Sequence, residues 1–162
     1  EVIALDASTT ALQVAHVLKE SAKSTIVVIT HALKVVMQLA DNANITVIST
    51  GGVLDRRTMS FIGPLAENAL ASYNIKKAFV SCKGLTIEEG ITESTDGQAR
   101  FKAQLIKGSK EIFILADHEK FGKAALATVA PVTVVHKIIT DKGSTEEELN
   151  RFRSMGIEVV IA

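Results

Sequence analysis

Short apolar runs recur along the whole chain, and they constrain its fold more than any other feature of the sequence. They lie at residues 2–5, 25–29, 45–48, 78–80, 112–116, 138–139 and 157–161. The runs are rich in valine and isoleucine and do not alternate with polar residues, which is typical of strands covered on both faces. Segments with helical periodicity separate most of them. The alternation predicts an α/β fold in which a mostly parallel sheet is covered by helices on both faces.

Five segments carry the periodicity or the start signals of helices. They lie at residues 10–22, 31–40, 64–72 and 97–107, and a last one opens with the capping box Ser144–Thr145–Glu146–Glu147. Two further stretches, residues 53–62 and 120–135, do not fit the alternation. Each could hold an extra strand or an excursion over a functional site.

Length and charge limit the possible functions. The chain has 162 residues and is most simply one domain, residues 1–162. Its 18 basic residues balance its 18 acidic ones, so no long-range field steers this segment to nucleic acid or to an anionic membrane. The single cysteine, Cys82, excludes an internal disulfide and fits a reducing compartment. No membrane span or signal peptide is visible, so we expect a cytoplasmic protein. The chain begins without Met, directly in a strand-like run, and we expect that an N-terminal neighbour has been removed.

Polar residues follow the apolar runs, at the places where ligands bind in open parallel sheets. They are Asp6 with Ser8, Thr9 and Thr10; Thr30 and His31; Thr50, Gly51 and Gly52; Lys83 and Gly84; Asp117 and His118; and Thr140 and Asp141. Each group has a plain alternative, because such residues routinely end strands and cap helices. Together they predict a polar pocket. Spacing places no third ligand beside Asp117 and His118, so we predict neither a metal site nor a cofactor.

The first of these turns predicts an anion site. A helix that begins near Ser8 or Thr9 has N–H groups without a partner inside the helix, and they point at whatever lies above the strand. A phosphate is the expected occupant, and the alternative is that Ser8 or Thr9 only caps the helix. Gly51 and Gly52 could likewise let backbone N–H groups approach a ligand closely, or could form no more than a turn.

Charged side chains supply further candidates. The guanidinium of Arg56 or of Arg57 could clamp a phosphate or simply be solvated. Lys102 falls inside the apolar arc of its predicted helix, so it either reaches solvent along its stem or meets an anion, whether a carboxylate or a ligand phosphate. Glu93 lies in the polar stretch 84–94, which we interpret as a loop over the site. Glu93 could face a sugar hydroxyl or Lys102, and the plain alternative is an exposed acidic residue of the loop.

In their order and spacing, these segments resemble the C-terminal sensor domain of DeoR-family bacterial transcriptional regulators. The resemblance covers essentially the whole chain. It rests on Asp6–Ala7–Ser8–Thr9–Thr10, Thr50–Gly51–Gly52, Ser60–Phe61–Ile62–Gly63–Pro64–Leu65–Ala66, Lys77–Ala78–Phe79, residues 84–92, Lys102 and Ala116–Asp117–His118–Glu119–Lys120–Phe121–Gly122. The resemblance implies an effector-binding domain related in fold to ribose-5-phosphate isomerase and CoA transferases, preceded in the full protein by a winged helix-turn-helix.

The resemblance also implies roles by position. The phosphate-binding first loop corresponds to Asp6, Ser8, Thr9 and Thr10, the glycine doublet to Gly51 and Gly52, the isomerase's catalytic lysine to Lys102, and a strand-end aspartate and the following lysine to Asp117 and Lys120. The chain departs from the family at two positions. Ser8 stands where glycine is common, and His31 stands where asparagine is usual.

Our leading hypothesis is a non-catalytic sensor, the effector domain of a regulator, most simply a repressor, of sugar metabolism. It binds a phosphorylated sugar or sugar acid, acts on DNA only through the missing domain, and forms homo-oligomers. The predicted ligand-binding residues are Asp6, Ser8, Thr9, Thr10, Thr30, Gly51, Gly52, Arg56, Gly84, Glu93, Lys102, Asp117 and Lys120. Ligand binding is expected to order the stretch 84–94.

Two alternatives come from other classes of protein. A sugar-phosphate isomerase needs a carboxylate base beside a cation, which Glu93 and Lys102 could supply. A purely structural oligomerisation module predicts that Lys102→Met stabilises the domain without loss of any ligand response.

Overall fold

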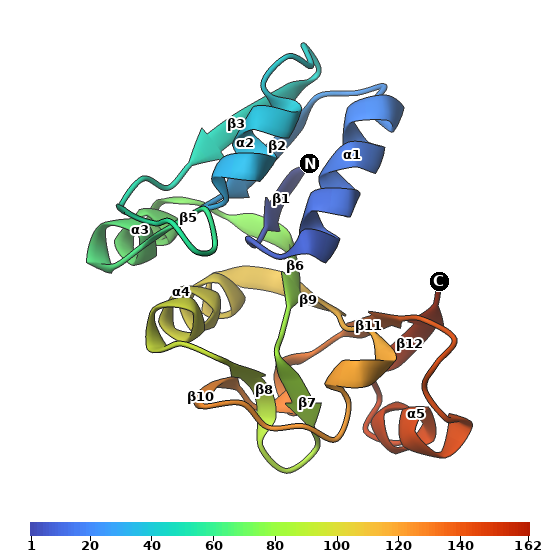
Figure 1. Cartoon of the computed structure of the whole chain (residues 1–162). Helices are drawn as coiled ribbons and strands as arrows, with labels where there is room; N and C mark the ends of the chain where they lie inside the picture. Colours follow the sequence, from blue (N-terminus) through green and yellow to red (C-terminus); the bar gives the residue numbers. More distant parts are fainter.

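A sheet of seven parallel strands runs through the centre of the molecule, in the order β12-β11-β9-β6-β1-β2-β3 (Figure 1). The computed structural model describes all residues, 1–162. The strands are β1 (Val2–Leu5), β2 (Ile26–Thr30), β3 (Ile45–Ser49), β6 (Ile75–Ser81), β9 (Ser109–Leu115), β11 (Lys137–Thr140) and β12 (Glu158–Ile161). Each of the seven apolar runs supplies one of these strands. The predicted α/β class with a parallel sheet is therefore confirmed.

The helices also lie where the periodicity predicts them. They are α1 (Thr9–Ser21), α2 (Leu33–Leu39), α3 (Pro64–Ala69) with a 3₁₀ turn at Leu70–Ser72, α4 (Asp96–Lys107) and α5 (Glu146–Arg153). The N-cap of α5 lies one residue later than Ser144, the first residue of the predicted capping box. It is Thr145, whose hydroxyl accepts the Glu148 N–H at 3.2 Å. No helix is long and apolar enough to cross a membrane.

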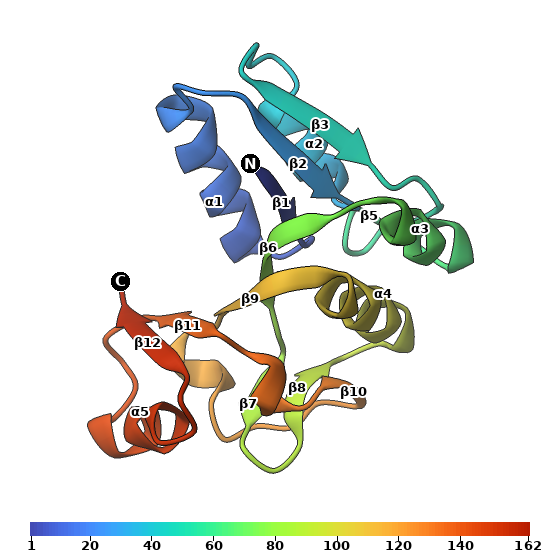
Figure 2. The ribbon, with the colours of Figure 1, turned by 180° about the vertical axis from the view of Figure 1, so that it is seen from behind.

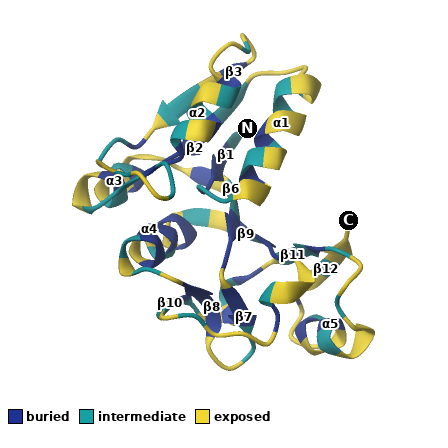
Figure 3. Ribbon diagram, in the orientation of Figure 1, coloured by how far each residue is buried: buried dark blue, intermediate teal, exposed yellow.

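The helices divide between the two faces of the sheet, as Figures 1 and 2 show from opposite sides. α1 and α2 pack on one face, where Ala11, Ala15, Val35 and Leu39 form a core with the inward side chains of β1 and β2. α3, α4 and α5 contribute to a larger core on the other face, which includes Ala66, Phe101 and Leu149 (Figure 3). The sheet therefore separates two hydrophobic cores, one for each set of helices.

The stretch 84–94 is not a loop, and that prediction was wrong. It forms β7 (Gly84–Thr86) and β8 (Gly90–Glu93), which join β10 (Ala127–Ala130) in a small antiparallel sheet of order β10-β8-β7. Leu85 and Ile91 are fully buried. Two polar residues of the stretch, Thr92 and Glu93, are buried as well and find partners: the Thr92 hydroxyl donates to the Gly84 carbonyl at 3.2 Å, and Glu93 pairs with Lys102. Glu88 and Glu89, at the turn between the two strands, are exposed. No ordering of a loop by ligand is therefore proposed.

The two stretches that did not fit the alternation hold additional strands. Residues 53–62 form a hairpin of β4 (Val53–Asp55) and β5 (Ser60–Ile62). Residues 120–135 hold β10 and, after it, a 3₁₀ turn at Val132–Val134. The strands of both excursions belong to short antiparallel sheets that are separate from the parallel one.

The centre of the sheet is a topological switch point. β1 lies between β2 and β6, pairing Leu5 with Thr30 on one side and with Phe79 on the other. The chain proceeds from β1 to β2 in one direction and returns to β6 before it continues in the opposite direction. A crevice forms beyond the carboxyl ends of strands at such a point, and it is the place where these folds bind ligands.

Candidate functional site

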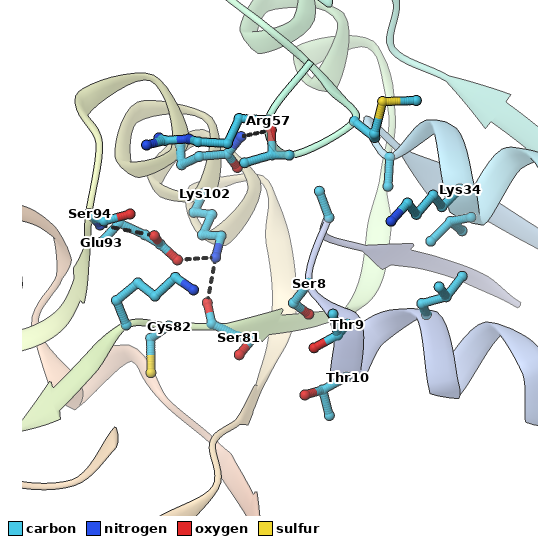
Figure 4. A pocket seen from close by; sticks show the side chains of 18 of the residues that line it. Ser8, Thr9, Thr10, Lys34, Arg57, Ser81, Cys82, Glu93, Ser94 and Lys102 are labelled. Carbon is cyan, nitrogen blue, oxygen red and sulfur yellow. Dashed lines mark hydrogen bonds and ion pairs between the residues drawn. The ribbon is translucent and has the colours of Figure 1, made fainter. Parts of the chain in front are cut away.

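A cavity of about 320 Å³ opens beyond the carboxyl ends of β1 and β6 (Figure 4). Its lining combines the start of α1, the ends of β6 and β8, the inner face of α4, the start of α2 and the tip of the β4–β5 hairpin. The polar lining residues are Ser8, Thr9, Thr10, Lys34, Arg57, Thr58, Ser81, Lys83, Glu93, Ser94, Gln98, Lys102, Asp117 and Lys120. Figure 4 places Glu93 and Lys102 on one side of the cavity and Thr9, Thr10 and Lys34 on the other.

The buried carboxylate of Asp6 fixes the turn at the start of α1 through hydrogen bonds. Its Oδ1 accepts both the Ser8 N–H at 3.0 Å and the Ser8 hydroxyl at 2.6 Å, and its Oδ2 accepts the Ser81 N–H at 2.8 Å. Ser8 is the N-cap, because its Oγ accepts the Ala11 N–H at 3.0 Å. The first-turn N–H groups of Thr9 and Thr10 have no partner inside the helix. They remain the donors that this turn can offer to an anion.

Lys102 meets two buried carboxylates rather than solvent. Its Nζ lies 3.0 Å from Asp6 Oδ2, pairs with Glu93, and donates to the Ser81 carbonyl at 2.7 Å. Burial opposes ionisation at both ends of the Asp6–Lys102 pair. The opposite charges outweigh burial, so the pKa of Asp6 lies below its ordinary value and the pKa of Lys102 lies above its own. Asp6 and Lys102 therefore stay charged at neutral pH, and together with Glu93 they form a fixed polar floor for the cavity.

The other basic side chains of the lining are not neutralised by a close carboxylate partner. Lys34, Arg57 and Lys83 make no ion pair, and Lys120 lies 4.0 Å from Asp117 Oδ2, at the limit of pairing. Together with Lys102 they give the lining five cations against the two carboxylates of Glu93 and Asp117. Exposed lysine and arginine groups next to helix N-terminal donors favour a small anion.

The structure brings most of the predicted site residues together. Ser8, Thr9, Thr10, Glu93, Lys102, Asp117 and Lys120 line the cavity, and Asp6 lies directly beneath them. Five others lie outside the lining. They are Thr30, Gly51, Gly52, Arg56 and Gly84.

Local structure accounts for four of these five residues. Thr30 is buried and uses its hydroxyl on the Leu5 carbonyl and the Ala32 N–H, at 2.7 and 3.0 Å. Gly51 and Gly52 have φ values of +66° and +123°, and a Cβ on Gly52 would lie 2.8 Å from the Ile62 carbonyl oxygen. A Cβ on Gly84 would lie 2.2 Å from the Lys123 carbonyl oxygen. Gly52 and Gly84 thus let two segments approach each other, and Gly51 supplies a positive φ. The exposed Arg56 lies outside the lining, whereas its neighbour Arg57 belongs to it.

Several lining residues escaped the sequence reasoning. Gln98 lies four residues before Lys102, so helical spacing could have placed it on the same face of α4. Lys34 lies in the first turn of α2, just after the end of β2. Cys82 also lines the cavity, but burial raises the pKa of its thiol to about 12, which makes it an unreactive group.

His118 and Asp141 form a pair beside the cavity. His118 Nδ1 lies 2.9 Å from Asp141 Oδ2, and both side chains are about half exposed. The hydrogen bond to Asp141 and its charge raise the pKa of His118. No group of three or more His, Cys, Asp or Glu side chains is close enough to hold a metal ion.

The fold and the cavity together define a class of protein: an α/β domain with a polar cavity, lined by several basic side chains, at the switch point of a parallel sheet. The sequence comparisons name the family. The model of the DeoR C terminal sensor domain matches residues 1–142, and the chain belongs to this family.

Three relatives illustrate the family. The chain is 40% identical over 141 residues to the uncharacterized HTH-type transcriptional regulator YulB of Bacillus subtilis, covering 87% of this chain and 54% of the relative. It is 32% identical over 145 residues to the transcriptional repressor AccR of Agrobacterium fabrum, covering 89% and 55%. It is 29% identical over 151 residues to the L-fucose operon activator of Haemophilus influenzae, covering 93% and 59%. The chain thus spans little more than half the length of these relatives. They are transcriptional regulators rather than enzymes, which decides against the isomerase alternative.

The fold has a counterpart among solved structures. A D-ribose-5-phosphate isomerase in complex with phospho-erythronic acid superposes with a TM-score of 0.52 at 14% sequence identity, covering 74% of this chain and 45% of the isomerase. The likeness confirms the predicted relation in fold to ribose-5-phosphate isomerase.

Proposed function

We propose that this chain is the non-catalytic effector-binding domain of a transcriptional regulator of sugar metabolism, and that it binds a phosphorylated sugar or sugar acid. The observation that carries the proposal is the cavity at the switch point, where the N-terminal donors of α1 meet an excess of basic side chains. The L-fucose operon controlled by one relative and the phospho-erythronic acid held by the isomerase both support a ligand of this chemistry.

The arrangement of the cavity supports one orientation of the ligand. Its phosphate lies at the start of α1, where Thr9 and Thr10 offer N–H groups and Lys34 offers an ammonium. Its hydroxyl or carboxylate groups face Lys102 and Glu93 on the other side of the cavity. A ligand of four to six carbons fits a cavity of about 320 Å³.

The length of the relatives bears on how such a domain acts. We infer that DNA binding belongs to the part of the relatives that this chain does not cover, and that the effector modulates it in a homo-oligomer, most simply of a repressor. Such a regulator works beside its DNA, in the cytoplasm.

Calorimetry and thermal unfolding with a panel of sugar phosphates test the proposal. A ligand at a hundred times its Kd adds about 2.7 kcal/mol of stability, which raises the Tm of a domain of this size by about 5–10 °C. Thr9→Glu is expected to weaken binding at least about tenfold, because the new carboxylate competes for the same donors and repels a phosphate. Thr133→Glu, at an exposed position of the 3₁₀ turn after β10, is the control and leaves binding unchanged. Intact binding by Thr9→Glu would show that the phosphate lies elsewhere.

A further inference from the structure

A buried histidine lies next to the site without contacting it. His31 follows β2 and is fully buried, and its ring stacks on Phe101 of α4 with the ring centroids 3.7 Å apart. Its Nε2 lies 3.3 Å from Gln98 Oε1, and its Nδ1 has no hydrogen-bond partner. Burial lowers the pKa of His31 to about 4, so the ring is neutral at pH 7.

Gln98 continues the contact toward the cavity. Its Nε2 donates to Thr58 Oγ1 at 3.1 Å and to Ser60 Oγ at 2.8 Å, so both of its N–H groups are used. Its Oε1 is therefore the atom that faces His31, and it can only accept. The hydrogen on the His31 ring must lie on Nε2, which leaves Nδ1 bare and explains why Nδ1 needs no acceptor.

The Asp55 carboxylate fixes the positions of the two hydroxyl protons in this series of hydrogen bonds, those of Thr58 and Ser60. Thr58 Oγ1 donates to Asp55 Oδ2 at 2.8 Å, and Asp55 can only accept. The hydroxyl proton of Thr58 is thus committed, so in the contact of 2.8 Å between Thr58 and Ser60 the Ser60 hydroxyl donates. Every hydrogen bond from His31 to Asp55 points in one direction. The hydrogen bond from Thr58 lowers the pKa of Asp55, consistent with a charged acceptor at its end.

This series of hydrogen bonds ends at the tip of the β4–β5 hairpin. Asp55 Oδ1 accepts the Arg57 N–H at 3.0 Å, and Arg57 lines the cavity. The same tip carries Met59, whose φ of +51° is uncommon for a residue other than glycine. A backbone in this conformation persists where its surroundings hold it.

We propose that Gln98, oriented by His31, is a positioning residue of the anion site: it fixes the tip of the β4–β5 hairpin and so holds Arg57 over the cavity. Gln98 and Lys102 lie one turn apart on α4, so the same helix sets the places of two of the cations that face the ligand. This proposal rests on the proposed function for the identity of the ligand. The hydrogen bonds from His31 to Asp55 are present in the structure without a ligand.

A double-mutant cycle tests the path through Arg57. Ribose 5-phosphate and phospho-erythronic acid are the calorimetric probes. Gln98→Met and Arg57→Ala are each expected to weaken binding about tenfold, and the double variant is expected to bind no more weakly than Arg57→Ala alone. Gln104→Met, the exposed glutamine on the opposite face of α4, is the matched control and binds as the unmodified chain does. Additive losses in the double variant, or unchanged binding by Gln98→Met, would overturn the proposal.

Two replacements of His31 distinguish its role in orienting Gln98 from its role in filling volume in the core. His31→Leu removes the donor and is expected to match the loss seen with Gln98→Met. His31→Gln keeps an N–H donor for Gln98 Oε1 and is expected to restore affinity to within about twofold of the unmodified chain. Equal losses in both variants would show that His31 contributes volume only.

Two measurements need no ligand, and they separate this proposal from the proposed function. The ¹⁵N chemical shifts of the His31 imidazole are expected to show a proton on Nε2, and a proton on Nδ1 would contradict the chain of hydrogen bonds. Hydrogen exchange of the Arg57 amide is expected to accelerate in Gln98→Met but not in Gln104→Met. If no phosphorylated probe binds the unmodified chain, the proposed function fails, and the exchange of the Arg57 amide still decides the positioning role.

Discussion

Lys102 shows at the scale of one residue how an electrostatic cluster shapes the site. Asp6 and Glu93 hold its ammonium at the bottom of the cavity, and all three side chains are almost inaccessible to solvent. The lowered pKa of Asp6 means that the stability it contributes is present above its ordinary value of 3.8 and is lost as pH falls through the folded value. The raised pKa of Lys102 means that its contribution is complete below 10.5 and is lost as pH rises through its folded value. The cluster therefore stabilises the fold between about pH 4 and 10.

Lys102→Met is expected to destabilise the fold at pH 7 by about 3–5 kcal/mol, because it leaves two buried carboxylates without their cation. Without Lys102, burial raises the pKa of Asp6, so the variant regains part of this loss as pH is lowered from 7 to 5. Urea unfolding at the two pH values measures both effects. Lys107→Met, at an exposed position of α4, serves as the control. A variant as stable as the unmodified chain at pH 7 would favour the purely structural module.

The sequence indicated that Lys102 was unusual, because a charged group in an apolar helical arc requires a partner. It left the partner open between solvent, a carboxylate and a ligand, since the partners come from β1 and β8, far away along the chain. Gln98 gave no such signal. An uncharged polar residue on a helix is ordinary, and its importance depends on His31 and Thr58, which only the folded chain brings to it.

At the scale of elements, a side-chain contact connects the loops that follow the neighbouring strands β9 and β11. His118 follows β9 and Asp141 follows β11, and their contact of 2.9 Å connects the two loops beside Asp117. A Cβ on Gly143 would lie 2.3 Å from the His118 ring, so the loop after β11 lies flat against the imidazole. The pair thus holds one wall of the cavity.

Asp141→Asn is expected to lower the pKa of His118 toward its ordinary value of 6.5, which NMR titration of the imidazole measures directly. Because the folded pKa is raised, the stability that the pair contributes is complete below 6.5 and is lost as pH rises through the folded pKa. The unmodified chain should therefore exceed the variant in stability at pH 6 and equal it at pH 9. A difference that persists at pH 9 would mean that Asp141 acts through its other hydrogen bonds, such as that from the Gly143 N–H.

Elements were predictable where their own residues carry a clear pattern. Each of the seven parallel strands contains an apolar run, and α1 and α4 are amphipathic, so these elements are visible in the sequence. β7 and β8 were misread because their interior side chains include Thr92 and Glu93, whose partners include the Ala125 N–H and the Lys102 ammonium from other segments. Polarity alone does not distinguish such a strand from a loop.

At the scale of the whole molecule, strand order creates the site. The apolar runs predict seven strands but carry no information about their order, so the switch point between β1 and β6 could not be located from them. The strand-end residues that line the cavity, from Ser8 to Lys120, lie at the ends of β1, β6, β8 and β9, whereas Thr30 and Gly51, at the ends of β2 and β3, lie away from it. The rule that ligands bind beyond strand ends thus named the edge of the sheet where the cavity lies, and topology selected the strands.

The balanced charge of the molecule leads to a prediction about DNA. Its 18 basic and 18 acidic residues give no net charge, and the cavity that is lined by five cations is too small for a duplex. Fluorescence anisotropy with double-stranded DNA is expected to detect no binding by this chain at physiological salt, with a Kd weaker than about 10⁻⁴ M. Repeating the titration at lower salt provides the control for weak electrostatic attraction. Specific binding that resists added salt would place DNA recognition in the sensor domain itself.

The position of β1 has a practical consequence for following the ligand in solution. The chain runs along β1 from Glu1, whose carboxylate pairs with Lys77 of the neighbouring strand β6, to Asp6 at the floor of the cavity. Five residues of extended chain separate the two points by about 17 Å. A fluorophore or surface tether attached ahead of Glu1 therefore leaves the mouth of the cavity open, which makes that end of the chain the natural point of attachment for immobilised binding measurements.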